Sequence, residues 1–123
     1  MATKRDRDAV AMAPAHDGAL VICDTVLAEI AYLEAMGTPG IVPLREGFVQ
    51  GVLRRKKLKG VLVEASANEV AFLLTLGVRE GVRIPEAANE VRRRVAAAVT
   101  AKTGYAVRAV NVLVDHVVFD KGS

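Results

Sequence analysis

Residues 61–78 read VLVEASANEVAFLLTLGV, and this stretch decides the fold. In its first five residues one face of an extended chain is entirely apolar, whereas Leu62 and Glu64 fall on the other face. Residues 67–69 supply a turn, and a second extended run follows at residues 70–78. The stretch therefore predicts two antiparallel strands joined as a β-hairpin.

The second strand of this hairpin is apolar on both faces. One face carries Ala71 and Leu73, and the other carries four large apolar side chains. A sheet that turns one face to water does not need such a strand, so a second layer of the chain or another subunit must cover it. We interpret the four large residues as a strand for self-association. They are Val70, Phe72, Leu74 and Leu76.

A helix and a strand are predicted after the hairpin. Pro85 suits the first turn of a helix, Glu86 beside it is favourable to the helix dipole, and Gly104 closes the helix. A final strand runs from Val107 to about Phe119. The helix is expected to bury Ile84, Ala88, Val91, Val95 and Val99, and the strand to place Val110, Val112, Val114 and Val118 on one face.

Before the hairpin the sequence predicts a strand, a helix and a short strand. The strand at residues 19–22 leads to Asp24, whose carboxylate is placed to cap the helix, and the Gly-Thr-Pro-Gly sequence at 37–40 ends it. A short strand follows at 41–44, and residues 1–17, which show no periodicity, form a flexible tail. The apolar stripe of this helix is expected to comprise Val26, Leu27, Ile30, Ala31 and Leu33.

The resulting order, β-α-β-β-β-α-β, predicts an α+β fold. We expect a two-layer sandwich in which two helices pack on a mainly antiparallel sheet. A chain of 123 residues supports one core, which we place in a single domain at residues 18–120. Because 52% of the residues are apolar but only 4% are aromatic, that core must be mainly aliphatic.

Composition favours a cytoplasmic protein. The single cysteine cannot form an internal disulfide, and the N-terminus lacks the apolar stretch of a signal peptide. No run of roughly 18 or more apolar residues is present to span a bilayer, so we expect any link to a membrane to go through a partner. The net charge of +3 makes the surface mildly basic, which is compatible with an anionic partner.

Side chains able to support catalysis are few. His16 lies in the expected tail, His116 lies on a strand with Asp115 on the opposite face, and Cys23 is expected to be buried where a strand meets a helix. One cysteine and two distant histidines do not supply four zinc ligands, and no phosphate-binding glycine motif occurs. The glycines at 37–40 match the GxxG loop of K-homology RNA-binding domains, but a helix stop explains them. We predict that the chain is not an enzyme and binds no metal or cofactor.

One segment has a charge density that could define a binding site. Five cations occupy six positions there, without an interleaved aromatic residue on which a base could stack. The segment is either a solvated loop or a patch that contacts phosphates of nucleic acid or of lipid head groups. This candidate anion-binding patch comprises Arg54, Arg55, Lys56, Lys57 and Lys59.

Several motifs follow one another in a specific order after Gly60. They are the hairpin at 61–74, Gly77 and Gly81, the helix start Ile84-Pro85-Glu86, the helix exit Thr103-Gly104 and the strand Val110-Asn111-Val112. In this order they resemble the bacterial alkaline shock protein, or envelope stress response, family. The N-terminal half is similar more weakly, and the sequence departs from the usual pattern at Cys23-Asp24, where a serine commonly starts the helix, and in the basic segment.

The resemblance implies a cytoplasmic protein without catalytic residues that serves cell-envelope homeostasis and stress. Some members of the family self-associate, and some are held at the membrane by partner proteins. We therefore expect a homo-oligomeric adaptor that acts through protein–protein contacts in the envelope stress response. The alternative is a small nucleic-acid-binding module that uses the basic segment 54–59.

Overall fold

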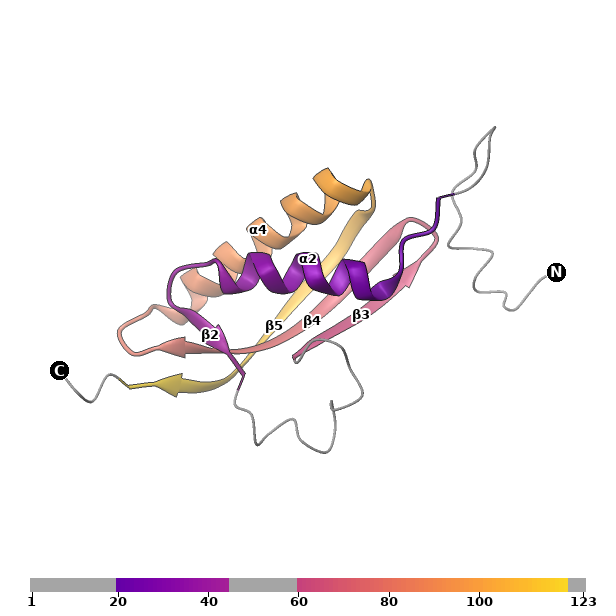
Figure 1. Ribbon diagram of the computed structural model, residues 1–123. Helices are drawn as coiled ribbons and strands as arrows, with labels where there is room; N and C mark the ends of the chain where they lie inside the picture. The colour runs from indigo at the N-terminus through magenta and orange to yellow at the C-terminus, as the bar shows by residue number, and fades with distance from the viewer. Residues whose placement is uncertain (1–19, 45–59, 120–123) are drawn as a thin grey trace, which may run out of the picture.

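The computed structural model describes residues 20–44 and 60–119 of the chain. Six elements follow one another in this part (Figure 1): α2 (Asp24–Met36), β2 (Ile41–Pro43), β3 (Val61–Ser66), β4 (Glu69–Arg79), α4 (Ile84–Thr103) and β5 (Ala106–Val118). The predicted hairpin is present as β3 and β4, and both predicted helices are present. The predicted strand at 19–22 is not, because residues 20–22 form no strand and residue 19 lies outside the described part.

The sheet is built around β4. On one edge β5 runs parallel to β4 over its full length, whereas β2 and β3 share the other edge and are antiparallel to it. β3 pairs with residues 69–74 and β2 with residues 76–78. β5 is parallel because α4 carries the chain back to the end at which β4 began, as a crossover helix does. Because β2 and β3 are both antiparallel to β4, the predicted mainly antiparallel sheet is confirmed.

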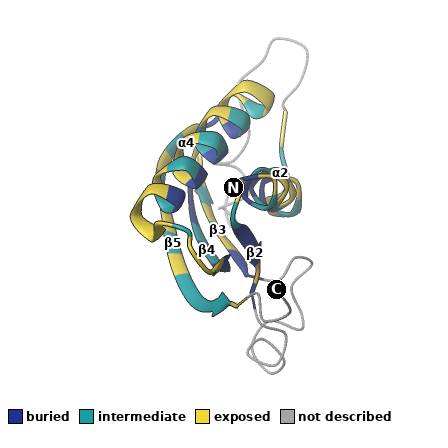
Figure 2. Ribbon diagram, turned by 90° about the vertical axis from the view of Figure 1, so that its left-hand side faces the viewer, coloured by how far each residue is buried: buried dark blue, intermediate teal, exposed yellow. Residues whose placement is uncertain are grey.

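Both helices lie on one face of this sheet and pack against each other. α2 contacts β2, β3 and β4, and α4 contacts β5. Buried residues line the space between the helices and the strands in Figure 2. This is the predicted two-layer α+β sandwich.

The core lies between the two layers and is mainly aliphatic. Alternate residues of β4 supply its centre, with side-chain exposures of 0–2%, and α4 adds one residue per turn. The contributors from β4 are Val70, Phe72, Leu74, Leu76 and Val78, and those from α4 are Ala87, Val91, Val95 and Val99. Ile84, expected in this stripe, is exposed, because it is the first residue of the helix.

The buried stripe of α2 differs from the predicted one. Three small residues, Ala28, Ala31 and Ala35, face the core together with Leu27. Val26 and Leu33, which were expected inside, are exposed. The helix is therefore rotated relative to the predicted orientation, so that its small alanine side chains face the core and allow close packing.

The C-terminal end of α4 is as predicted, whereas the N-terminal end of α2 is not. Gly104 has a φ of 80°, the left-handed conformation expected after a helix end, and it donates its N–H to Thr100 O at 2.9 Å. Asp24 does not cap α2 as predicted. It is the first helical residue, after Cys23 at the N-cap position, so its carboxylate acts only through the helix dipole.

Two irregularities interrupt the register between β4 and β5. The first leaves Arg108 and the second leaves Asp115 as an extra residue in β5. After the second bulge the side-chain alternation is reversed, so that Val117, and not Val118 as predicted, packs against the core.

Candidate interaction face of the sheet

The two helices leave the other face of the sheet without a helical cover in the described residues. We call it the outer face. Its residues follow from the strand register, because side chains directly opposite one another lie on the same side of a sheet. In order along the strands the rows are Ser66, Glu69 and Ala106; Glu64, Ala71 and Ala109; Leu62, Leu73 and Asn111; Thr75 and Leu113; and Val42, Gly77 and His116.

Two leucines are the most exposed apolar residues of the outer face. Leu62 is 40% exposed and Leu113 is 47% exposed, while Leu73 between them on β4 is half-buried. Leu62 lies directly opposite Leu73, and Leu113 is two residues beyond Asn111, the other neighbour of Leu73. The three leucines therefore form a diagonal across three strands, at separations over which side chains of neighbouring strands interact.

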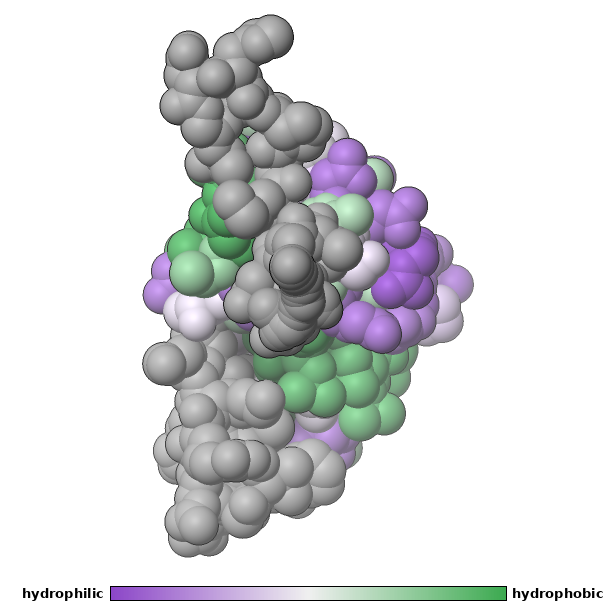
Figure 3. All heavy atoms as spheres, turned by 90° about the vertical axis from the view of Figure 1, so that its right-hand side faces the viewer, coloured by the Kyte–Doolittle hydropathy of each residue, from purple (hydrophilic) through white to green (hydrophobic). Residues whose placement is uncertain are grey.

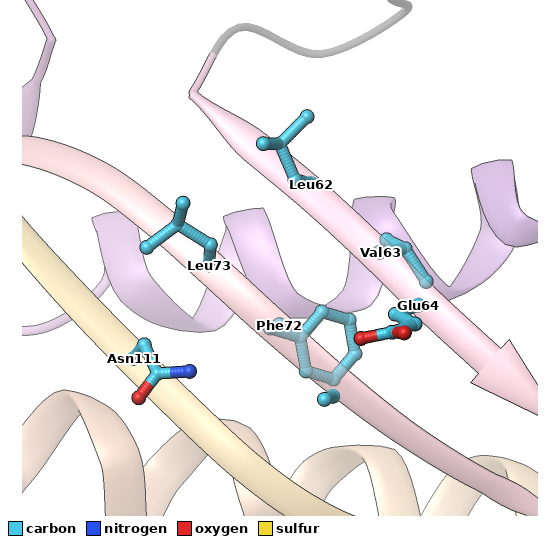
Figure 4. A pocket seen from close by; sticks show the side chains of 7 residues that line it. Leu62, Val63, Glu64, Phe72, Leu73 and Asn111 are labelled. Carbon is cyan, nitrogen blue, oxygen red and sulfur yellow. The ribbon is translucent and has the colours of Figure 1, made fainter.

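A shallow hollow of about 220 Å³ opens beside this diagonal. Figure 4 shows the strands from the outer face, with Leu62 on β3, Leu73 on β4 and Asn111 on β5, and with α2 behind them. Apart from backbone groups, the polar groups that line the hollow are the Glu64 carboxylate and the Asn111 amide. Such a lining suits an apolar side chain with a polar neighbour, and it lacks a set of acid, base and nucleophile for chemistry.

Charged side chains border the outer face near the hairpin turn. The Arg108 guanidinium lies 3.7 Å from Glu64 Oε1 and 3.9 Å from Glu69 Oε1. All three side chains are at least half exposed, so solvent screening leaves these ion pairs little effect on stability.

At the other end of the outer face, His116 covers Gly77. His116 Nδ1 lies 2.5 Å from Asp115 Oδ1, and both side chains are largely buried. The sequence predicted that Asp115 points to the opposite face. That prediction was wrong, because the bulge at Asp115 interrupts the alternation and brings the two neighbouring side chains together.

Comparison with protein families identifies this chain. The model of the alkaline shock protein family, which is described by a cell envelope-related function, matches residues 12–119. The chain belongs to the alkaline shock protein family. The resemblance seen in the sequence is thereby confirmed, and membership implies a cell envelope-related function. No curated protein and no solved structure matches the chain.

In this alkaline shock protein domain, the side chains predicted to mediate self-association do not lie on the outer face. Val70, Phe72, Leu74 and Leu76 are inside the core, at 0–2% exposure, beneath the helices. A side chain enclosed by its own domain cannot contact a second subunit without opening that domain. On the opposite face of β4, Leu73 and Thr75 are partly exposed.

The other predicted sites have different outcomes. The candidate anion-binding patch of residues 54–59 and His16 lie outside the described residues. Cys23 is exposed, contrary to the expected burial, because it precedes the first turn of α2 and does not lie on its packed side. Among residues 20–44 and 60–119, no three His, Cys, Asp or Glu side chains are grouped to hold a metal ion.

Sequence reasoning missed Leu113 and did not recognise Leu62 as part of a site. The signal was available for both, since each is an apolar residue at a strand position that alternates with the core-facing ones.

No helix in the described residues is long and apolar enough to cross a membrane. On the side of the molecule drawn in Figure 3, apolar residues gather below a hydrophilic area.

Proposed function

We propose that this chain is a non-enzymatic assembly protein of the cytoplasm, and that it serves its envelope-related function by self-association through the outer face of the sheet. The observation that carries the proposal is the diagonal of Leu62, Leu73 and Leu113 on a face that neither helix covers.

The energetic argument starts from the exposed area of these leucines. Complete burial of a leucine side chain contributes roughly 1.5–3 kcal/mol relative to leaving it in water. Leu62 and Leu113 are each about half exposed, so an interface that covers both gains a part of this from each subunit. In a two-fold symmetric pair each residue contributes twice, because the same surface of both subunits is buried.

The hollow makes part of this apolar area concave. It lies beside Leu62 and Leu73, and its volume of about 220 Å³ is open to a side chain from a second subunit. The Asn111 amide at its edge can both donate a hydrogen bond to the backbone of that subunit and accept one from it. A membrane-held partner protein of similar chemistry is the other occupant that this face would accept.

Sedimentation velocity over a concentration series tests the proposal. We expect the parent chain to form dimers or larger species and the double variant Leu62→Glu, Leu113→Glu to remain a monomer, because the added carboxylates would be buried opposite one another. Leu33→Glu is the matched control, since Leu33 is 68% exposed but lies on α2, in the other layer. A parent chain that is strictly monomeric at high concentration would refute self-association, and equal effects of all these substitutions would refute the assignment to the outer face.

The alternative function, nucleic-acid binding, depends on residues 54–59, outside the described part of the chain. It stays a prediction, with its own test in the Discussion.

A further inference from the structure

In the described part of the chain, the long strand β5 forms one edge of the sheet. It has 13 residues, and within the described residues it pairs with β4 alone. A strand at the edge of a sheet offers unpaired N–H and C=O groups to another strand, which makes it a site for pairing between copies of a chain.

The register identifies which backbone groups of β5 are open. Thr75 donates its N–H to Gly60 O at 2.7 Å, toward the β3 side, so the alternate residues of β4 turn theirs toward β5. In a parallel pair, these residues bond to the neighbours of their partners in β5. The partners themselves, Val110, Val112 and Val114, therefore turn their N–H and C=O groups to the open edge.

A side chain from α4 occupies this edge at one point. Arg92 donates from Nε to the carbonyl oxygen of Val110 at 3.1 Å, a bond to an acceptor that the β-ladder leaves unused. Arg92 Nη1 also donates to Asn89 Oδ1 at 2.6 Å, which holds the guanidinium over the edge. A charged group at this place blocks an approaching strand, because pairing would displace the hydrogen bond and bury an arginine without a counter-ion.

The two bulges of β5 lie on either side of this point. Arg108 and Asp115 are the extra residues, and a bulge bends and twists an edge strand so that a regular second strand fits less well. Bulges at both ends and a charged side chain between them are the means by which natural sheets keep edges from pairing.

We propose that Arg92 keeps the β5 edge closed to the β5 strand of a second copy of this chain, so that assembly is restricted to other surfaces. Pairing at this edge would use backbone groups of β5, whereas association through the outer face uses side chains. This inference assigns Arg92 a role in limiting edge-to-edge pairing, which its surface position on a helix would not suggest.

The test compares two neighbouring arginines of α4. Arg92→Ala removes the group over the edge, whereas Arg93→Ala removes the same charge from a side chain whose ion pair is with Glu90 on the helix itself. We expect Arg92→Ala to lower the concentration at which light scattering detects association on the order of tenfold, the equivalent of one charge-assisted hydrogen bond, and Arg93→Ala to behave as the parent. Arg92→Met, which keeps the aliphatic stem, is measured in parallel in case the alanine variant is less well folded.

Amide hydrogen exchange locates the new contact. If the edges pair, the N–H groups of Val112 and Val114 become protected in the associated Arg92 variants, and they stay unprotected in an assembly through the outer face. Unchanged association of both Arg92 variants would overturn the proposal. So would association without protection at these two amides, or equal association of the Arg93 variant.

Discussion

The imidazole ring of His116 lies directly over the Cα of Gly77. A Cβ added at position 77 would be 2.4 Å from Cε1 and 2.6 Å from Nε2 of the ring, far inside van der Waals contact. The two residues face each other across β4 and β5, and a side chain on one of them is possible only because the other has none.

Gly77→Ala should therefore destabilise the domain by about 1–3 kcal/mol through overpacking. Because the clash is with the ring, the same substitution in a His116→Ala background should cost less, and a double-mutant cycle from urea denaturation measures the difference. An equal cost of Gly77→Ala in both backgrounds would show that the ring does not set the requirement for glycine.

Gly104 is expected to matter for folding alone. Its left-handed backbone is costly for a β-branched residue, so Gly104→Val should lower the free energy of unfolding by about 1 kcal/mol or more. Gly104→Asn is the control, since asparagine tolerates this conformation better. If the valine variant changed self-association while its melting temperature stayed the same, the structural role of Gly104 would be wrong.

Phe72 tests the assignment of the apolar face of β4 to the core. It is 1% exposed, so Phe72→Ala should cost about 3–5 kcal/mol, measured by chemical denaturation. Leu62→Ala, on the outer face, should stay within roughly 0.5 kcal/mol of the parent. A Phe72→Ala variant that is as stable as the parent but no longer associates would restore the original interpretation of this strand as the contact surface.

The basic segment separates the envelope role from nucleic-acid binding. Replacement of Arg54, Arg55, Lys56, Lys57 and Lys59 by glutamine should weaken binding to polyanions if these side chains bind phosphates. The log–log salt dependence on duplex DNA should then flatten by about one unit or slightly less for every phosphate that is no longer neutralised.

Binding measured with anionic vesicles and with duplex DNA distinguishes the two roles of this segment. Vesicle-only binding supports the envelope role, and sequence-selective DNA binding supports the alternative. Unchanged behaviour of the glutamine variant with both polyanions would identify the segment as a solvated loop.

Much of the fold was predictable because the determining signals are local. The hairpin at 61–78 follows from alternation around a short turn, and α4 follows from its proline start, its valine stripe and Gly104. Both elements depend on interactions between residues that are close in the chain, and the order of apolar, polar and turn residues in the sequence shows these interactions directly.

The face of β4 was harder to assign for a physical reason. An apolar residue at 70, 72, 74 or 76 satisfies a core and an interface equally well, since both remove it from water. Only the position of α2 and α4 shows that these residues face inward and that Leu62, Leu73 and Leu113 lie on the side that neither helix covers.

By itself, then, the sequence determined the α+β class, the hairpin, both helices and membership of the alkaline shock protein family, because periodicity, turn residues and ordered motifs are properties of the linear chain. The tertiary structure alone decided the rest. It made β5 parallel to β4 and turned the alanines of α2 toward the core. It also introduced the bulge that brings Asp115 beside His116. It also placed Arg92 over the carbonyl of Val110. These features depend on contacts between segments far apart in the chain, whose energies no local pattern of residues encodes.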